Sequence, residues 1–423
     1  MKLRSLGVFA AIVLLCEQHV FAFQSGQVLS AIPSTSRQAE ILQNLTATHE
    51  IVLWKPVTVE FIEKEKEVHF FVNDSDVSSV KTHLNESSIQ FSVLMGDVED
   101  IIRQQTSQVT IGPRTSYSYY EHYHPLSEIY SWIEAITEWN PDMIEKIHIG
   151  SSYEKYPLYV LKISRKDQTA KNAIWIDCGI HAREWISPAF CLWFVGHVTQ
   201  FYGKDRLYTN LLSHTDFYVM PLVNVDGYDF SWKENRMWRK NRSSHGNNRC
   251  IGTDLNRNFA SKHWCGEGAS SSPCSETYCG PFPESEPEVK AVADFLRRNI
   301  KHIKAYISVH SYSQHILFPY SYNRSKTKDH EELSLVASEA VHAIERTHKN
   351  IKYTHGSGSE SFYLAPGGAD DWIYDLGIKY SFTIELRDTG KYGFLLPARY
   401  IKPTCKEAMV AVYKIAWHTI RNV

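Results

Sequence analysis

The chain has 423 residues, of which 43% are hydrophobic and 22% charged, as is typical of a globular protein with room for one large and one small domain. Its 45 basic and 47 acidic residues nearly cancel, so charge gives no reason to expect binding to nucleic acid or a membrane surface. Beyond the N-terminus, no segment is apolar over enough residues to predict a membrane span.

The N-terminus has the pattern of a secretory signal peptide. Lys2 and Arg4 precede an apolar run that ends near Cys16, and the small residue Ala22 offers a cleavage site. We therefore expect residues 1–22 to be removed and the protein to be secreted. The alternative is a buried N-terminal helix.

Secretion also predicts N-glycans, and the chain contains five Asn-X-Ser/Thr sequons. We expect glycans at Asn44, Asn73, Asn85 and Asn241. The fifth sequon is at Asn323.

The cysteines predict disulfides, because a secreted protein meets an oxidising environment. Of the eight, Cys16 leaves with the signal peptide, and seven leave one unpaired. Cys178 and Cys191 could pair across the stretch between them, and Cys405, in an amphipathic C-terminal helix, is the expected free thiol. Four others share a polar, Gly/Ser-rich loop: Cys250, Cys265, Cys274 and Cys279. Their pairing is left open, and a structural zinc site is the alternative, although the C-x2-C pairs it favours are absent.

Residues 23 to about 90 predict a small α+β module. Short alternating runs at 49–62, 68–72 and 87–95 indicate strands, and 76–84 indicates a helix between them. A further helix is expected at 97–108. The polar, turn-rich stretch 109–128 is then typical of a linker.

From about Ser127 onward, helices alternate with apolar strands, which predicts an α/β sheet covered on both faces. Helices are expected at 127–140, 188–203, 284–300, 330–348, 370–377 and from Pro403 onward. Strands are expected at 144–150, 158–164, 173–180, 216–224, 303–310 and 380–386.

Three His-x-x-Glu pairs occur in the chain: His83 with Glu86, His181 with Glu184, and His342 with Glu345. The first overlaps a sequon and the third lies in an amphipathic helix, so both are interpreted as surface pairs. The middle pair follows a buried strand, at the carboxyl end where α/β sheets bind ligands.

A catalytic zinc site uses three protein ligands and leaves a position for water, and two histidines with one glutamate are such a set. His310, at the end of strand 303–310, is the best third ligand, although a lone histidine there is more often a hydrogen-bonded core residue. Glu385 lies on strand 380–386, on the same face as Thr383. A carboxylate in an apolar strand costs several kcal/mol unless it is paired or functional, and beside zinc it can act as a general base.

Basic and amide side chains lie between these strands. Arg239, Asn256 and Arg257 are candidates for binding an anion, because a guanidinium group matches a carboxylate in a two-pronged hydrogen bond. The alternative is that these residues are simply solvated.

Four motifs in this order and spacing resemble the zinc metallocarboxypeptidase A/B family: "HAREW" from His181, "DLNRNF" from Asp254, "HSYSQ" from His310 and "IELRDTG" from Ile384. The resemblance runs from about Tyr119 to Val423, and the preceding segment resembles that family's activation peptide. It implies a mixed central sheet with helices on both faces, preceded by a small α+β activation domain. Residues 1–22 would be the signal peptide, 23–114 the activation peptide with its linker, and 115–423 the catalytic domain.

The resemblance also implies roles for individual residues: His181, Glu184 and His310 as ligands of one zinc ion, Glu385 as the base, Arg239 as the group that stabilises the oxyanion, Asn256, Arg257 and Tyr363 as ligands of the substrate's terminal carboxylate, Arg183, Ser311 and Tyr312 along the substrate groove, and Asp254 as the partner that orients His181.

In the family, the residue two positions after a pair of glycines lies at the bottom of the side-chain pocket. Here that residue is Asp370, and an acid there implies selection of Lys or Arg. The alternative is that Asp370 and Asp371 both belong to a helix N-terminus, where the helix dipole favours them.

The stretch "GPRTS" predicts that a trypsin-like protease such as thrombin or plasmin cuts between Arg114 and Thr115. The resemblance implies peptide and protein substrates that end in Lys or Arg, including partly degraded fibrin in plasma, so that the enzyme slows fibrinolysis. No nucleic-acid or membrane partner is expected.

Two alternatives to this function remain. One is an inactive carboxypeptidase-like binding glycoprotein, which should lack the base or a ligand. The other is an enzyme with A-type specificity, which Asp370 argues against.

Overall fold

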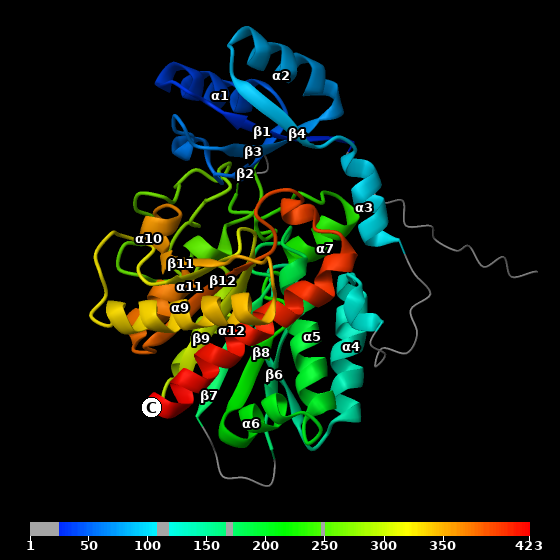
Figure 1. The fold of residues 1–423 in the computed structure, drawn as a ribbon, viewed down its shortest axis with the longest axis vertical. Helices are drawn as coiled ribbons and strands as arrows, with labels where there is room; N and C mark the ends of the chain where they lie inside the picture. Colours follow the sequence, from blue (N-terminus) through cyan, green and yellow to red (C-terminus); the bar gives the residue numbers. More distant parts are fainter. Residues whose placement is uncertain (1–24, 108–117, 166–171, 247–249) are drawn as a thin grey trace, which may run out of the picture.

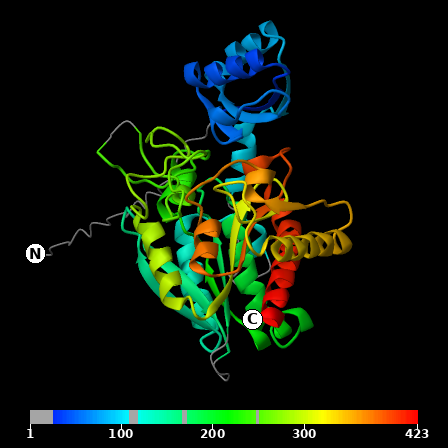
Figure 2. The ribbon, with the colours of Figure 1, turned by 90° about the vertical axis from the view of Figure 1, so that its left-hand side faces the viewer.

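The computed structural model describes residues 25–107, 118–165, 172–246 and 250–423. A small domain is stacked on a large one (Figure 1), and helix α3 (Val98–Thr106) runs from the small domain alongside the large one (Figure 2). The expected signal peptide and the expected cleavage site at Arg114 and Thr115 lie outside the described residues. Within these residues, no helix has the length and apolar character needed to cross a membrane.

The small domain is a four-stranded antiparallel sheet in the order β2-β3-β1-β4. Its elements are β1 (Gly26–Ile32), α1 (Ser36–Thr48), β2 (Ile51–Lys55), the 3-10 turn η1 (Val59–Phe61), β3 (Val68–Asn73), α2 (Asp74–Glu86) and β4 (Gln90–Met95). Thr35 and Asn73 begin the two helices, because each side chain accepts a hydrogen bond from a first-turn N–H group.

The two faces of this small sheet pack against different partners, because successive side chains of a strand point to opposite sides. Leu29 and Phe70 pack in the core beneath the helices. Their neighbours Val28 and Phe71 belong to a second apolar cluster, which includes Phe394 of the large domain. The small domain therefore docks on the large one through its open sheet face.

The large domain contains an eight-stranded mixed sheet in the order β11-β10-β12-β9-β7-β8-β6-β5. Its strands are β5 (Ile144–Ser151), β6 (Pro157–Ile163), β7 (Ala173–Cys178), β8 (Asp216–Met220), β9 (Ile303–Ser311), β10 (His315–Phe318), β11 (Thr354–Ser357) and β12 (Tyr380–Leu386). The central strands β8, β7, β9 and β12 run parallel. Their carboxyl ends therefore lie along one edge.

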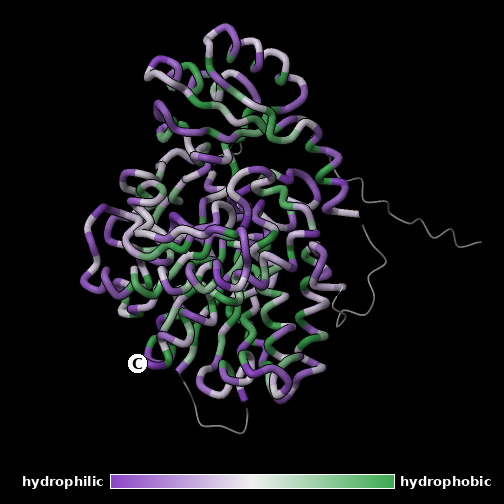
Figure 3. Tube along the Cα trace, viewed as in Figure 1, coloured by the Kyte–Doolittle hydropathy of each residue, from purple (hydrophilic) through white to green (hydrophobic). Residues whose placement is uncertain are grey.

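Helices cover both faces of the large sheet (Figure 1). They are α4 (Leu126–Trp139), α5 (Ile186–Phe201), α6 (Arg206–His214), α7 (Val225–Lys233), α8 (Pro287–Asn299), α9 (His330–Thr347), α10 (Gly358–Ser361), α11 (Ala369–Leu376) and α12 (Ile401–Asn422). On β8, Phe217 contacts Phe194 of α5, whereas its neighbour Tyr218 contacts Phe295 of α8 on the opposite face. Apolar residues accordingly gather in the strands and the inner helix faces (Figure 3).

The predicted fold class is confirmed, but the linker prediction is wrong from residue 118 onward. Tyr119, Tyr120 and Tyr123 are at most 5% exposed and belong to the core of the large domain. The rings of Tyr120 and Tyr123 pack on Trp132 and Trp185. The polar residues between these tyrosines gave the segment the composition of a linker. The strands β1, β10 and β11 and the helices α1, α6, α7 and α10 were not predicted.

The described cysteines form three disulfides: Cys178 with Cys191, Cys250 with Cys274, and Cys265 with Cys279. Cys405 is free and buried, as predicted. The structure thus gives the pairing of the four loop cysteines, which the sequence left open. The alternative zinc site is excluded, because all four sulfur atoms are in disulfide bonds.

The expected glycan at Asn241 conflicts with the structure. Its side chain is fully buried, and its amide Nδ2 donates to Glu286 Oε2 at 2.7 Å and to Glu288 Oε2 at 3.3 Å. A sugar on this nitrogen would have to displace both bonds and the surrounding core. Asn44 and Asn85, in contrast, are exposed on the small domain.

Candidate metal centre and substrate cleft

The carboxyl ends of two neighbouring strands, β7 and β9, bring the predicted metal ligands together. Strand β7 ends at Cys178, and the chain turns at Gly179, whose φ of 66° and close approach to Leu222 leave no room for a side chain. This turn presents His181 and, before α5 begins, Glu184. On β9, His310 lies next to β7.

The ligand atoms of these three residues face one another. Nδ1 of His181 is 2.8 Å from Oε1 of Glu184, Nδ1 of His310 is 3.3 Å from Oε2, and the two Nδ1 atoms are 3.2 Å apart. All three side chains are buried. Among the described residues, they form the one cluster of three or more such groups with all ligand atoms within 4.8 Å.

The opposite ring nitrogens have partners that fix which nitrogen carries the proton. Nε2 of His181 is 3.2 Å from Oδ1 of Asp254. Nε2 of His310 is 3.1 Å from the Ser308 hydroxyl, which itself donates to Asp177 Oδ1 at 2.7 Å. Both Nε2 atoms therefore act as donors, which leaves a lone pair on each Nδ1 directed into the cluster.

Arg239 lies beside this cluster and is held by Asp254. Its Nη2 donates to Asp254 Oδ2 at 2.8 Å, and its Nη1 is 3.9 Å from Glu184 Oε1. Burial alone raises the pKa of Asp254, but the nearby guanidinium groups of Arg239 and Arg257 and the hydrogen bond with His181 hold it well below its ordinary value. Asp254 is thus a fixed negative charge that orients a ligand and a guanidinium group together.

Glu385 lies on β12 directly beside His310, because the parallel strands pair these two residues in register. Burial raises the pKa of Glu385, and the negative charge of Glu184 adds to this effect, whereas His310 and Arg239 oppose it. Thr383 and Glu385 line the same hollow, as their shared strand face predicts. A carboxyl group with a raised pKa beside a metal cluster is suited to accept and return a proton.

Comparison with known proteins then decides the family. Residues 129–411 match the model of the zinc carboxypeptidases, and residues 29–105 match that of the carboxypeptidase activation peptides. The chain belongs to the zinc carboxypeptidase family.

Individual proteins are similar over most or all of the chain. Human carboxypeptidase B2 is 77% identical over 423 residues, with 100% of both chains covered. The crystal structure of thrombin activatable fibrinolysis inhibitor has a TM-score of 0.94 at 76% identity and covers 95% of this chain and 100% of its own. A structure of bovine thrombin-activatable fibrinolysis inhibitor in complex with tick carboxypeptidase inhibitor has a TM-score of 0.69 at 77% identity, over 72% of this chain and 100% of its own.

The cluster fits the zinc ion of this family. Two imidazole nitrogens and one carboxylate are the donor set of a catalytic zinc site, and the Nε2 partners described above are the outer contacts that such ligands need. The buried Glu184 carboxylate favours positive charge at this point: burial lowers the pKa of His310, but Glu184 outweighs burial and raises that pKa to about 9. His181, Glu184 and His310 would hold the ion.

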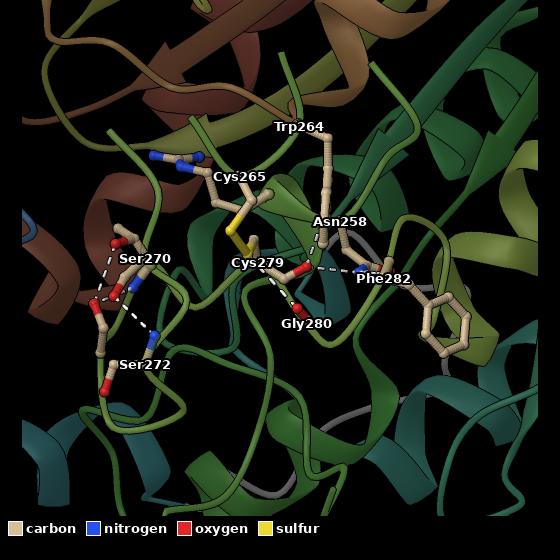
Figure 4. Close-up of a disulfide and its surroundings, with 12 residues drawn as sticks. Asn258, Trp264, Cys265, Ser270, Ser272, Cys279, Gly280 and Phe282 are labelled. Carbon is tan, nitrogen blue, oxygen red and sulfur yellow. Dashed lines mark hydrogen bonds between the residues drawn. A yellow bond between two sulfur atoms is a disulfide. The ribbon is translucent and has the colours of Figure 1, made fainter. Parts of the chain in front are cut away.

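The turn that carries Asn256 and Arg257 is fixed by a disulfide-bonded loop (Figure 4). Nδ2 of the next residue, Asn258, donates to the carbonyl oxygens of Cys279 at 2.8 Å and Phe282 at 3.0 Å. The disulfide between Cys265 and Cys279 holds this segment in place. These contacts give Asn256 and Arg257 a defined position.

A side hollow leads from the metal cluster to Asp370. Its lining includes His181, Glu385, Arg257 and Asp370. The hydroxyl groups of Ser321 and Thr383 each lie 3.4 Å from Asp370 Oδ2. Burial raises the pKa of Asp370. Across the described part of the chain, no Lys or Arg forms an ion pair with this carboxyl group.

Asp371 has a different position from its neighbour. Its carboxylate accepts hydrogen bonds from the backbone N–H groups of Ser321, at 2.9 Å, and Tyr322, at 2.7 Å. It anchors the loop after β10 and does not point into the side hollow. Both residues lie in the first turn of α11, so the helix end accommodates both, but only Asp370 also lines the side hollow.

The small domain forms a roof over the cleft. A space of about 790 Å³ extends between the metal cluster and the small-domain segment that contains Trp54 and Phe61. Phe61 stacks on the predicted substrate-binding residue Tyr363, with ring centroids 5.3 Å apart. His69 Nδ1 lies 3.0 Å from the Tyr312 hydroxyl. The roof thus contacts the rim of the cleft and leaves the ligands untouched.

One groove prediction needs correction for this form of the chain. Arg183 is fully buried, with its guanidinium 4.3 Å from the Phe394 ring centroid, so it does not line the cleft. Ser311 lines the cleft, but its backbone N–H donates to Glu184 Oε2 at 3.2 Å, which positions a ligand. Sequence analysis missed Ser308 and His69. Ser308 was within reach, because it lies two residues before His310 on the same strand face.

Proposed function

We propose that this chain is the secreted zymogen of a carboxypeptidase that removes C-terminal Lys or Arg from peptides and proteins. The proposed parts are a signal peptide at 1–22, an activation peptide with its linker at 23–114 and a catalytic domain at 115–423. The name of a similar protein, thrombin activatable fibrinolysis inhibitor, gives thrombin as its activating protease and fibrinolysis as the process it inhibits. On that basis we extend the proposal to thrombin as activator and to partly degraded fibrin as substrate, so that the enzyme slows fibrinolysis.

The observation that carries the proposed specificity is the buried carboxyl group of Asp370 at the end of the side hollow. A buried carboxylate without a cation is costly, and a substrate ammonium or guanidinium group would supply one. An aromatic or aliphatic side chain would leave Asp370 unpaired. The geometry therefore favours basic side chains.

The proposed mechanism assigns each step to a side chain. Zinc, when bound, acts as a Lewis acid and makes a nearby water more acidic. Glu385 takes the proton of the attacking water and returns it to the leaving amine nitrogen. Arg239 donates to the oxygen on which negative charge develops; its Nε is buried without a hydrogen-bond partner within the described residues.

The proposed exopeptidase selectivity follows from Asn256, Arg257 and Tyr363. Arg257 is 2% exposed, and its guanidinium is 4.0 Å from Asp254, too far for a strong hydrogen bond. A substrate's terminal carboxylate would pair with it, whereas an internal peptide bond brings no charge. With an internal peptide bond, the buried guanidinium would keep only its hydrogen bonds to the carbonyl oxygens of Asn256 and Gly268 and its long contact with Asp254, which disfavours internal cleavage.

Proposed activation is removal of the roof after cleavage at Arg114. Because the metal ligands, Glu385 and Arg239 all lie beyond Thr115, cutting there removes no catalytic group. The signal peptide, the sequons exposed on the small domain and the disulfides support secretion.

The test compares the secreted protein before and after trypsin or thrombin treatment. Blocked peptides that end in Arg or in Phe serve as substrates, with and without a zinc chelator. We expect a new N-terminus at Thr115, a rise in cleavage of the Arg peptide with its appearance, and loss of that cleavage with chelator. Preference for the Phe peptide would contradict the specificity, and an unchanged rate after complete cutting at Arg114 would contradict the activation step.

A further inference from the structure

The sequon Asn323-Arg324-Ser325 lies in the loop between β10 and α9. Asn323 is partly exposed, and Arg324 and Ser325 are exposed. The loop is well anchored up to this point, because Asp371 binds the N–H groups of Ser321 and Tyr322. Asn323 is therefore a fixed attachment point at the surface.

Three sequons share one local turn and differ in where the amide nitrogen points. The side-chain oxygens of Asn73, Asn241 and Asn323 each accept from the N–H group two residues on, at 3.3, 3.3 and 2.9 Å. At Asn241 the nitrogen is buried on two carboxylates. At Asn323, no hydrogen bond from Nδ2 to any described residue is present, so this nitrogen is free for a substituent.

The space beside Asn323 adjoins the substrate cleft. A hollow of about 430 Å³ is lined by Asn323, Tyr322, His263 and three residues that also line the cleft, Glu267, Arg324 and Leu364. The ring of Tyr322 packs on His263, with centroids 4.8 Å apart, and forms one wall. The two spaces therefore meet at a shared rim.

We propose that Asn323 carries an N-linked glycan that extends along this hollow and restricts the approach of large proteins to the cleft. The inference rests on the secretion part of the proposed function. In the transfer, Asn323 Nδ2 bonds to the anomeric carbon of a lipid-diphosphate-linked oligosaccharide, the bond from that carbon to the diphosphate oxygen breaks, the lipid diphosphate leaves, and the amide nitrogen loses a proton. The glycan is bulky and polar, so it suits a rim open to solvent.

The test uses the full chain secreted from cells that make N-glycans. Enzymatic glycan removal in ¹⁸O-water, followed by peptide mass mapping, marks each modified asparagine as a labelled aspartate. We expect label at Asn44, Asn73, Asn85 and Asn323 and none at Asn241. An unmodified Asn323 beside modified small-domain sites would overturn this inference alone; absence of label at every site would overturn both it and secretion.

The effect on the cleft is tested with Asn323→Gln and Ser325→Ala, which remove the sequon, and with Ser325→Thr, which keeps it. After activation, removal should raise kcat/KM for a large protein ending in Lys on the order of threefold to tenfold, within the span of association rates among variants of one interface. A blocked dipeptide should be cleaved at an unchanged rate. Equal rates on the large protein for Asn323→Gln and Ser325→Thr would overturn the guarding role.

Discussion

The metal centre and the roof above it are built on different principles. In the metal centre, His181, Glu184 and His310 are each fixed by a partner in the large domain, such as Asp254 or the Ser311 N–H group. In the roof, contact is mostly aromatic packing from a separate domain, as for Phe61 on Tyr363.

This difference explains how one chain can hold a finished site and still keep it covered. Directed hydrogen bonds preorganise the catalytic groups, so they need no rearrangement when the cover leaves. Apolar packing has little directionality, so the small domain can detach as a unit. Changes to the metal centre should therefore abolish chemistry, whereas changes to the roof should only release it.

The largest effect is expected for Glu385→Gln. Gln cannot take a proton, so kcat of the activated enzyme should fall by about 10³-fold or more, near the upper range for a general base. Because Glu385 is not among the three ligands, bound zinc measured by atomic emission should remain at one per chain. Glu145→Gln, a change on the exposed strand β5, is the control and should leave kcat unchanged. Full activity of Glu385→Gln would remove this residue from the mechanism.

Asp370→Asn should come next in size. Loss of one partner of a buried charge pair costs about 3 kcal/mol or more, so kcat/KM for peptides ending in Arg should fall by about 100-fold. Peptides ending in Phe should be affected much less, because an uncharged Phe side chain forms no ion pair with Asp370 that the change to Asn could remove. Asp294→Asn on α8 is a matched change outside the cleft. An unchanged ratio of Arg to Phe cleavage would show that Asp370 does not set specificity.

A smaller effect is expected from Trp54→Ala in the roof. Trp54 is 4% exposed, and its ring lies 5.2 Å from Phe394 and 6.4 Å from Tyr312. Removal of a buried tryptophan costs about 3–5 kcal/mol, so the roof should open more often. The uncut chain should then cleave a small Arg peptide several times faster, measured as initial rates. After activation, its rate should equal that of the unchanged enzyme.

Trp139→Ala is the control for this change, because that tryptophan is 48% exposed at the end of α4. If the uncut Trp54→Ala chain stays as slow as the original, the roof is held by other contacts.

The same contrast separates what the sequence could and could not predict. Strand ends followed by polar residues could be predicted from the sequence, because runs of apolar residues and their alternation with polar ones are local patterns. These strand ends led to His181, His310 and Glu385. The strands β10 and β11 are four residues long, too short for a period to emerge. Long α5, in contrast, was predicted within two residues at either end.

Contacts between distant segments were not readable. Burial of the Asn241 amide depends on Glu286 and Glu288, which lie more than forty positions away. Likewise, the family resemblance placed Arg183 in the groove, but in this structure its guanidinium packs on Phe394. Such partners are brought together by the tertiary fold, and no spacing in a single sequence encodes them.

The smallest expected effect is a pH dependence of the roof itself. His69 is 2% exposed against Tyr312, and its Nε2 lies 3.2 Å from Glu67. Burial lowers the pKa of His69, while Glu67 and the more distant Asp388 oppose the shift and Lys55 adds to it. The neutral form is therefore the one that docks.

A histidine with a lowered pKa contributes to docking above its unperturbed value of about 6.5, and this contribution is lost as the pH falls toward the lowered value. Between pH 7.5 and 5.5, the uncut chain should gain activity on a small Arg peptide relative to the activated enzyme assayed at the same pH. His69→Gln, which can still hydrogen-bond to Tyr312 but does not titrate, should flatten that ratio. If the ratio rises equally in both chains, other groups govern the docking, and the neutral imidazole is not what ties the roof to the rim.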